Sequence, residues 1–161
     1  MSKDFATADL TDEHPELEVL EPIFVGFGKK AKFSGAVKTI KVFEDNTSVK
    51  RLVKSPGEER VLVIDGGGSM RCSLVGDNLA RFAIENGWNG ILVFGAIRDS
   101  AVIDEMEISI KALGTFPKKS VKRAEGLEDI ALKFAGVTIS PGDYIYSDED
   151  GIIISPKSLL S

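Results

Sequence analysis

The stretch that decides the fold covers residues 61–99 and reads VLVIDGGGSMRCSLVGDNLARFAIENGWNGILVFGAIRD. It begins with the continuous apolar run 61–64, which is typical of a strand buried on both faces of a sheet. Gly76 then opens a helix predicted over 77–85, which Asn86 and Gly87 end, and a second buried strand is predicted over 90–94. A strand, a helix and a strand within about 35 residues predict a parallel crossover unit.

Shorter elements are predicted on both sides of this unit. Towards the N-terminus we expect a helix over 7–17, a strand over 36–43 and a helix over 47–54 that Asn46 caps. Within the unit, a short strand-like piece is expected over 70–75, before the helix. The last third is β-rich, with strands expected over 130–134, 137–139, 144–147 and 152–154 and a hairpin turn at Asp150-Gly151. The sequence therefore predicts one domain over residues 1–161, of the α/β class with a central mixed sheet.

Composition narrows the classes of protein. Hydrophobic residues make up 43% and charged residues 28%, as in ordinary globular proteins. The net charge of −5 and the lack of any evident basic tract argue against direct binding of nucleic acid. The single cysteine, Cys72, allows no internal disulfide and suits a reducing compartment. With no apolar run long enough for a membrane and no signal-peptide pattern at the start, we expect a cytoplasmic protein.

Histidine is nearly absent, which restricts the chemistry. The only histidine is His14, so a zinc site built from several histidines is excluded. His14 precedes Pro15 and is poorly placed for a Ser-His-Asp triad. Catalysis is expected to use carboxylates, arginine, backbone dipoles and a hard metal ion.

Four other motifs have plain structural interpretations. The segment 26–31 fits the letters of a dinucleotide fingerprint but neither follows a clear strand nor opens a helix, so we expect a loop. Residues 66–68 lack the rest of a P-loop and predict a tight loop beside a ligand site. Residues 148–151 lack two ligands of a calcium loop and predict a solvated turn. Cys72 is expected to be a packed strand residue rather than a nucleophile.

One combination of residues points to a site. The segment Gly76-Asp77-Asn78-Leu79 begins the predicted helix, where unpaired N–H groups and the helix dipole favour a carboxylate or phosphate. Arg98 and Asp99 follow the next strand, and parallel strands bring these ends to one edge of the sheet. Arg98 can bind a carboxylate through two nitrogens, and Asp99 can hold a hard divalent cation. An Arg-Asp pair alone is usually a surface ion pair, but this position favours function.

These residues also carry a family resemblance, which covers nearly the whole chain. The sequence resembles the family of the regulator of ribonuclease activity A, which is similar to the class II 4-hydroxy-4-methyl-2-oxoglutarate aldolases. The aldolase motif is an acidic residue, 20 intervening residues and then Arg-Asp; here Asp77, Arg98 and Asp99 stand at that spacing. The other matching segments are 42–46, 63–69, 76–80, 95–99, 134–138, 141–143 and 150–153.

The resemblance implies an α/β/α swivelling-type domain that forms a ring-shaped homotrimer with sites at the subunit boundaries. It implies that the amides of Gly76 to Leu79 bind a pyruvate carboxylate, that Arg98 contacts the pyruvyl group, that Asp77 and Arg98 are catalytic, and that Asp99 binds Mg²⁺ or Mn²⁺. The expected reaction is cleavage of a 4-hydroxy-2-oxo acid to pyruvate through an enolate, with oxaloacetate decarboxylation as a secondary activity.

Two features leave a second function open. Many aldolase members carry an acidic residue three or four positions after the arginine, whereas Ala101 and Val102 stand here and the nearest acids are Asp104 and Glu105. We therefore expect weaker support of the metal and its waters. The alternative is a protein without catalytic activity that inhibits an endoribonuclease of the RNA degradosome. Overall similarity favours this regulator, and Asp99 favours the enzyme.

Overall fold

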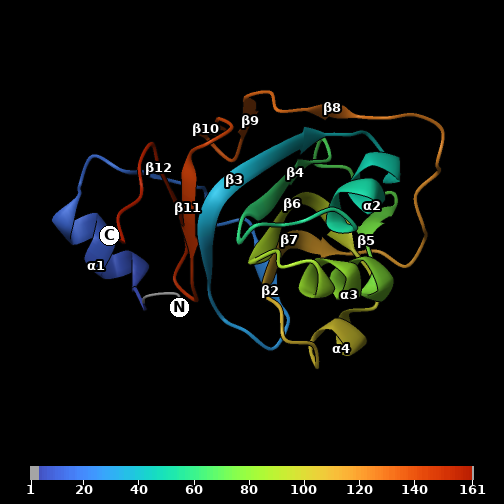
Figure 1. Cartoon of the computed structure of the whole chain (residues 1–161), viewed down its shortest axis with the longest axis horizontal. Helices are drawn as coiled ribbons and strands as arrows, with labels where there is room; N and C mark the ends of the chain where they lie inside the picture. The colour runs from blue at the N-terminus through green and yellow to red at the C-terminus, as the bar shows by residue number, and fades with distance from the viewer. Residues whose placement is uncertain (1–3, 161) are drawn as a thin grey trace.

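The computed structural model describes residues 4–160, and these residues build a strongly curled mixed sheet (Figure 1). Ten strands join in the order β1-β12-β11-β3-β4-β6-β7-β2, with β5 paired to β6 and β8 paired to β3. Four strands at the centre run parallel: β3 (Phe33–Lys41), β4 (Val61–Asp65), β6 (Gly90–Ile97) and β7 (Ile110–Thr115).

Antiparallel strands extend this parallel centre on both sides. On one side β2 (Val25–Phe27) pairs with β7. On the other side β11 (Tyr144–Ser147) pairs with the start of β3 and β8 (Leu127–Glu128) with its end, and β12 (Ile152–Ser155) and β1 (Glu18–Val19) follow β11. β9 (Leu132–Phe134) and β10 (Val137–Ile139) form a separate hairpin. The prediction of a mixed central sheet is confirmed.

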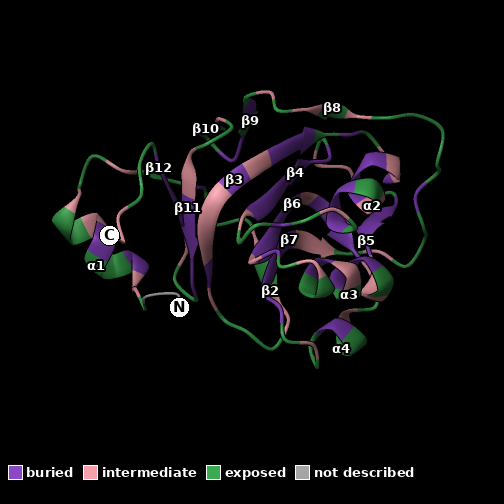
Figure 2. Ribbon diagram, in the orientation of Figure 1, coloured by how far each residue is buried: buried purple, intermediate pink, exposed green. Residues whose placement is uncertain are grey.

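Alternation of side chains along β4 explains why its sequence is apolar throughout. Every residue of β4 is buried (Figure 2). Leu62 and Ile64 point to the core shared with helices α2 (Thr47–Val53), α3 (Asp77–Glu85) and α4 (Ser100–Ile103). Val61 and Val63 point to the opposite core, which β9 to β12 close. Because successive residues of a strand face opposite sides, a strand with a core on each side needs apolar residues at every position.

A fourth helix lies outside the curled strands. α1 (Thr7–Glu13) packs Leu10 against Tyr146 and Ile153 of β11 and β12, far from α2, α3 and α4 (Figure 1). Helices α2, α3 and α4 thus cover one face of the central strands, and α1 lies beside β11 and β12. The α/β class is confirmed. No helix within residues 4–160 is long and apolar enough to cross a membrane.

The short strand β5 (Ser73–Val75) determines where the site forms. β4 pairs with the first part of β6, and beyond Asp65 the chain leaves the sheet through Gly66–Gly68 and returns as β5 beside the last part of β6. Gly67 and Gly68 have φ angles of +69° and +73°, which favour glycine. The carboxyl ends of β5 and β6 are therefore neighbours.

Several predicted boundaries differ from the structure. The first helix ends at Glu13, before Pro15, rather than at residue 17. The strand predicted over 36–43 is β3, and it begins three residues earlier at Phe33. The strand-like piece predicted from residue 70 begins only at Ser73.

Three local interpretations are corrected. Gly26 lies in β2, on the edge of the sheet, rather than in a loop. The side chain of Asn46 does not cap α2; the Asp45 carboxylate accepts the hydrogen bond from the Thr47 N–H at 2.9 Å. The turn at 148–151 is not fully solvated, because Asp148 is buried and accepts hydrogen bonds from the N–H and hydroxyl of Thr7, both at 2.7 Å.

Candidate active site

The first turn of α3 is the centre of the site. α3 begins directly after Gly76 and packs Leu79, Ala80 and Ala83 into the core, which fixes the direction of its axis. The first amides of a helix have no partner within the helix. The N–H of Asp77 donates to Asp99 Oδ2 at 3.1 Å, so Asp99 satisfies one of them from outside the helix. The N–H groups of Asn78 and Leu79 follow in the same first turn of α3, at the positive end of the helix dipole.

Asp99 reaches α3 through an unusual backbone conformation. Its φ of +59° and ψ of +36° lie in the left-handed region, which costs an ordinary residue on the order of 1 kcal/mol. Its carbonyl accepts from the N–H of Ile103 at 2.9 Å and so begins α4. This turn directs the carboxylate back to the start of α3.

Gly76 makes that approach possible. A Cβ at residue 76 would lie 2.7 Å from Asp99 Oδ2 and 3.5 Å from Cγ and Nε of Arg98. Any larger residue would displace the carboxylate. The glycine is therefore required by close approach rather than by a positive φ angle.

The backbone of Arg98 is hydrogen-bonded to β5, and most of its side-chain N–H donors have no partner among residues 4–160. Its N–H donates to the carbonyl of Val75 at 3.0 Å, which continues the pairing of β5 and β6. The half-buried guanidinium makes one long contact, from Nη1 to the carbonyl of Pro117 at 3.3 Å. A guanidinium has five N–H donors, so the others remain for a ligand.

All the predicted site residues line one pocket of about 340 Å³. They are Gly76, Asp77, Asn78, Leu79, Arg98 and Asp99. The structure thus brings together Asp77 and Arg98, which 20 residues separate in the sequence, as the parallel crossover predicts.

The mouth of this pocket is positively charged, and the sequence analysis missed it. Lys50, Lys54, Arg81, Lys119 and Lys122 line the pocket together with Arg98, against only two carboxylates. In a chain of net charge −5, this gathers positive potential at one place and attracts anions. The signal was present at 118–123, which reads KKSVKR, and in Lys50 of α2 and Lys54, which directly follows that helix.

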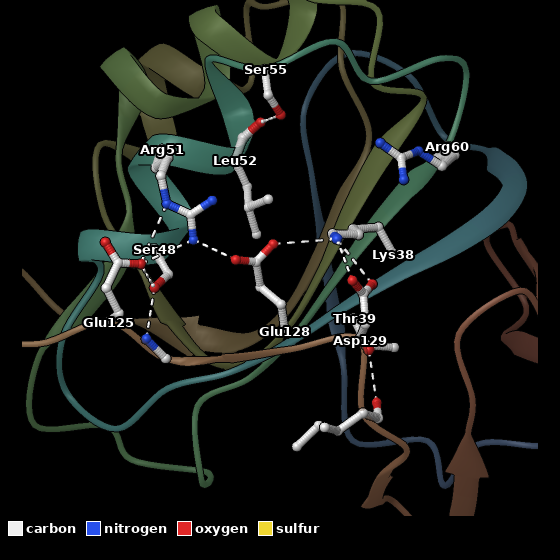
Figure 3. A network of polar contacts seen from close by, with 12 residues as sticks. Lys38, Thr39, Ser48, Arg51, Leu52, Ser55, Arg60, Glu125, Glu128 and Asp129 are labelled. Atoms are coloured by element: carbon white, nitrogen blue, oxygen red, sulfur yellow. Dashed lines mark hydrogen bonds and ion pairs between the residues drawn. The ribbon is translucent and has the colours of Figure 1, made fainter.

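A network of ion pairs positions the connection between β7 and β9, which carries Lys119 and Lys122. Glu125 accepts from Ser48 at 2.8 Å and from Nη2 of Arg51 at 2.9 Å, and Arg51 also binds Glu128 at 2.6 Å (Figure 3). Lys38 pairs with Glu128 and with Asp129. The pKa values of Glu125 and Glu128 are lowered, mainly by hydrogen bonds from Ser48 and from Arg51 respectively.

Asp45 anchors the same connection next to the pocket. Its Oδ2 accepts from the N–H groups of Arg123 at 2.6 Å and Ala124 at 2.8 Å, and its Oδ1 accepts from Thr47. Burial opposes ionisation, but these hydrogen bonds outweigh it and lower the pKa of Asp45 to about 2. Lys119 and Lys122 are thus carried on a segment fixed to α2.

The donor set suits a hard cation that keeps its own water. Asp99 is exposed, and within residues 4–160 no group of three or more His, Cys, Asp or Glu could hold a metal. A single carboxylate with space beside it fits Mg²⁺ or Mn²⁺, which retain waters and take further oxygens from a substrate. Neither of the two nearest acids, Asp104 and Glu105, lines the pocket in place of Ala101 and Val102, and Asp104 accepts from the N–H of Gly28 at 2.8 Å.

Fold and site together define an α/β protein with a positively charged pocket at the carboxyl ends of two parallel strands. The chain belongs to the RraA-like family, described as Aldolase/RraA, which matches residues 7–154. This confirms the family resemblance seen in the sequence.

Close relatives carry an aldolase name. A protein from Laribacter hongkongensis, named "Putative 4-hydroxy-4-methyl-2-oxoglutarate aldolase", is 51% identical over 98% of this chain and 99% of its own length. A protein from Alkalilimnicola ehrlichii with the same name is 50% identical over 96% of each chain.

Two solved structures share the fold but carry other names. One is described as an S-adenosylmethionine:2-dimethylmenaquinone methyltransferase from Geobacillus kaustophilus, with a TM-score of 0.92, 46% identity and coverage of 97% of this chain and 98% of that one. The other is the RNA-processing inhibitor RraA from Thermus thermophilis, with a TM-score of 0.92, 44% identity and coverage of 96% and 94%. Three different names on one fold mean that function must be argued from the site.

Proposed function

We propose that this chain is a divalent-metal-dependent aldolase that cleaves a 4-hydroxy-2-oxo acid, such as 4-hydroxy-4-methyl-2-oxoglutarate, to pyruvate. The observation that carries the proposal is the Asp99 carboxylate, held in a left-handed conformation at the glycine-started N-terminus of α3 beside Arg98. A strained carboxylate with one oxygen lacking a partner among residues 4–160 suits cation binding better than protein stability. The aldolase name of relatives at about 50% identity supports the same reaction.

Each residue of the pocket has a role in this reaction. The amides of Asn78 and Leu79, with the dipole of α3, bind the carboxylate next to the ketone. Arg98 binds the ketone oxygen and stabilises the negative charge that develops there. Asp77 takes the proton of the 4-hydroxyl. Asp99 would hold Mg²⁺ or Mn²⁺, which when bound supplies further electrophilic assistance to the ketone.

The bond changes balance without an oxidant or a second substrate. The 4-hydroxyl loses its proton, C4–O becomes a carbonyl and the C3–C4 bond breaks. The electron pair of that bond forms the enolate of pyruvate, and C3 takes up a proton. Decarboxylation of oxaloacetate reaches the same enolate by loss of CO₂, so we expect it as a secondary activity. The lysines at the mouth suit the further carboxylate that both substrates carry.

We further propose a homotrimer. Phe43, Val121 and Leu127 are large apolar side chains that are 59%, 49% and 61% exposed. They line a groove of about 540 Å³ on the connection that also carries Lys119 and Lys122. A second copy on this surface would bury the apolar groups and cover one side of the active-site pocket. The expected compartment is the cytoplasm, where the buried Cys72 stays reduced.

The second candidate function is inhibition of an endoribonuclease. The likeness to the RNA-processing inhibitor from Thermus thermophilis favours it. The apolar groove around Phe43 offers a docking surface for such a partner only where the chain does not assemble through that groove. The two functions do not exclude each other, because the groove and the pocket are different surfaces.

An assay of pyruvate release tests the proposal. The protein is given 4-hydroxy-4-methyl-2-oxoglutarate or oxaloacetate with Mg²⁺, with Mn²⁺ or after a chelator. The proposal predicts release that needs the metal. It also predicts that activity survives treatment of the protein with borohydride and pyruvate, followed by removal of both, because no lysine adduct forms. Release that persists with a chelator and is abolished by this prior borohydride treatment would instead assign the reaction to one of the pocket lysines.

A further inference from the structure

Arg81 is the one cation at the mouth of the pocket that α3 itself carries. It follows Asp77 by four residues and Asn78 by three, so the helical repeat places these side chains on one side of α3. All three residues line the active-site pocket. Arg81 thus lies one turn along the helix from the amides to which we assign the carboxylate next to the ketone.

The guanidinium of Arg81 is held from two sides. Its Nη2 donates to Oδ1 of Asn78 at 2.7 Å, which draws the group back towards the first turn of α3. Its central carbon lies 5.8 Å from the centre of the Phe82 ring. Phe82 is half-buried and packs against the core beneath α2 and α3, so its ring is a firm support for a cation. Arg81 is therefore positioned before a ligand arrives.

Most of the N–H donors of Arg81 stay available. Glu85 is the only carboxylate within ion-pair distance of Arg81 among residues 4–160, with 3.9 Å between Nε and Oε1. That separation is too long for a hydrogen bond, and the two side chains are 51% and 59% exposed. Nη1 has no hydrogen-bond partner within the same residues. Both hydrogens of Nη1 and one of Nη2 can therefore bind a carboxylate.

The proposed substrate has a group that fits this arrangement. A 4-hydroxy-2-oxo diacid carries one carboxylate beside the ketone and a second, distal carboxylate at the other end of the chain. The amides of α3 and Arg98 are assigned to the ketone end. The lysines of the mouth attract anions, but an ammonium on a flexible stem gives little direction, whereas a guanidinium held in place offers a planar pair of donors.

We propose that Arg81 binds the distal carboxylate of the substrate and makes the protein selective for oxo diacids over oxo monoacids. This inference rests on the proposed aldolase function and adds a specificity-determining residue to it. The distal carboxylate keeps its charge while the C3–C4 bond breaks, so the contact is equally strong in the bound substrate and in the transition state. Arg81 therefore affects KM more than kcat.

The test uses two substrates of equal chain length that differ in the distal group. 4-Hydroxy-2-oxoglutarate has a carboxylate there, 4-hydroxy-2-oxopentanoate has a methyl group, and cleavage of either releases pyruvate. Arg81→Met removes the charge and keeps an unbranched side chain. KM for the diacid should rise about 5- to 50-fold in Arg81→Met, as for a charge-assisted contact weakened by water, and KM for the monoacid should change by less than about threefold.

Inhibition constants repeat this comparison without the chemical step. 2-Oxoglutarate and 2-oxopentanoate have the same chain length and differ in the same distal group. The unaltered protein should bind 2-oxoglutarate more tightly, by about 5- to 50-fold, and Arg81→Met should lose this preference. The ratio of two constants from one sample does not depend on the folded fraction, so partial unfolding of Arg81→Met does not obscure the result.

Two further variants separate a contact from the effect of overall charge. Lys29→Met removes an exposed cation that pairs with Glu107 and lies outside the pocket, and it should leave both ratios unchanged. Lys54→Met removes a cation that lies in the pocket mouth, 4.8 Å from the centre of the Phe82 ring. Its effect on the diacid should be smaller than that of Arg81→Met and should disappear in added salt, which screens a long-range potential.

Two results overturn the inference while the aldolase function stands. An equal rise of KM for diacid and monoacid in Arg81→Met would show a structural role. Equal effects of Arg81→Met and Lys54→Met on the diacid would show that the potential of the mouth, rather than a contact with Arg81, selects it. No pyruvate from either substrate with the unaltered protein would remove the proposed function and this inference together.

Discussion

In the proposed mechanism the Asp99 carboxylate has two partners, the N–H of Asp77 and a divalent metal ion. Its Oδ2 satisfies the first amide of α3, and its other oxygen is left for a cation. Asp99 therefore also contributes to stability, because its loss removes a hydrogen bond to the first amide of a helix. We expect a cost of about 0.5–2 kcal/mol to folding, which the protein should tolerate.

Gly76 should be as important as the charged residues, although it has no side chain. Gly76→Ala places a Cβ 2.7 Å from Asp99 Oδ2, so the carboxylate must move and metal-dependent pyruvate release should fall at least about 100-fold. Gly151→Ala is the control, since nothing lies within 4 Å of the added Cβ. Kinetics of both variants with oxaloacetate check this prediction. Full activity in Gly76→Ala would show that the close approach of Asp99 is not needed.

Substitution of Arg98 should have a different effect on activity from substitution of Asp99. In Arg98→Ala the binding of the oxo acid should weaken about 10- to 150-fold, which corresponds to one charge-assisted contact. The loss in kcat/KM should exceed the loss in binding, because the enolate needs the positive charge more than the ketone does.

Arg98→Lys provides the comparison. It should recover only part of the loss, because an ammonium lacks the planar pair of donors. Binding is measured by the inhibition constant of pyruvate and catalysis by steady-state kinetics. Equal losses of binding and activity in the alanine and lysine variants would show that the positive charge at residue 98 does not explain the effect.

At the scale of elements, the connection between β7 and β9 depends on Asp45. The pKa of Asp45 is lowered to about 2, against 3.8 for an ordinary aspartate, so its contribution to stability is complete above about pH 4. The contribution is lost as the pH falls through about 2, because the protonated carboxyl accepts the Arg123 and Ala124 amides less well.

Replacing Asp45 tests this anchoring. Asp45→Asn should lower the free energy of unfolding at pH 7 by about 1–2 kcal/mol, and the difference from the unaltered protein should shrink between pH 4 and pH 2. Urea unfolding at several pH values measures the difference. Asp12→Asn, at an exposed helical position, should leave stability unchanged at every pH. A constant difference between Asp45→Asn and the unaltered protein would mean that Asp45 acts through shape rather than charge.

Local sequence patterns predicted the elements that carry strong signals and missed those interrupted by a polar residue. The run 61–64 and the helix 77–85 were predicted within a residue of their bounds. β7 was not predicted, because Lys111 interrupts its apolar pattern. In the structure Lys111 is buried in the centre of the sheet and donates to the carbonyl of Asp148 at 2.8 Å. Burial lowers its pKa, which is the physical cost of that position.

The candidate site was predicted as far as adjacent parallel strands determine it. Asp77 and Arg98 meet because β5 and β6 are neighbours, which follows from the crossover alone. The lysines at 119 and 122 come from a segment far away in the chain. Asn46 was interpreted as a helix cap because its residue type suits one, whereas Asp45 takes that role. Only tertiary structure reveals this difference.

At the scale of the whole molecule, the apolar groove predicts assembly. Static light scattering at micromolar concentration should give three times the chain mass of 17.4 kDa. Leu127→Asp should dissociate the trimer, because it places a charge among Phe43 and Val121. Val19→Asp, at another exposed apolar residue on β1, should not. A monomer in the unaltered protein would contradict the assembly proposal.

The central claim is that Asp99 supports metal-dependent cleavage of an oxo acid, and one measurement tests it most directly. Pyruvate release from 4-hydroxy-4-methyl-2-oxoglutarate is compared for the unaltered protein, Asp99→Ala and Asp104→Ala, each with Mg²⁺ or Mn²⁺ and after a chelator. Asp104→Ala removes a nearby carboxylate whose hydrogen-bond donor among residues 4–160 is the N–H of Gly28. We predict metal-dependent release by the unaltered protein and by Asp104→Ala, and none by folded Asp99→Ala. Release by Asp99→Ala at the full rate, or no release by the unaltered protein with either metal, would contradict the account.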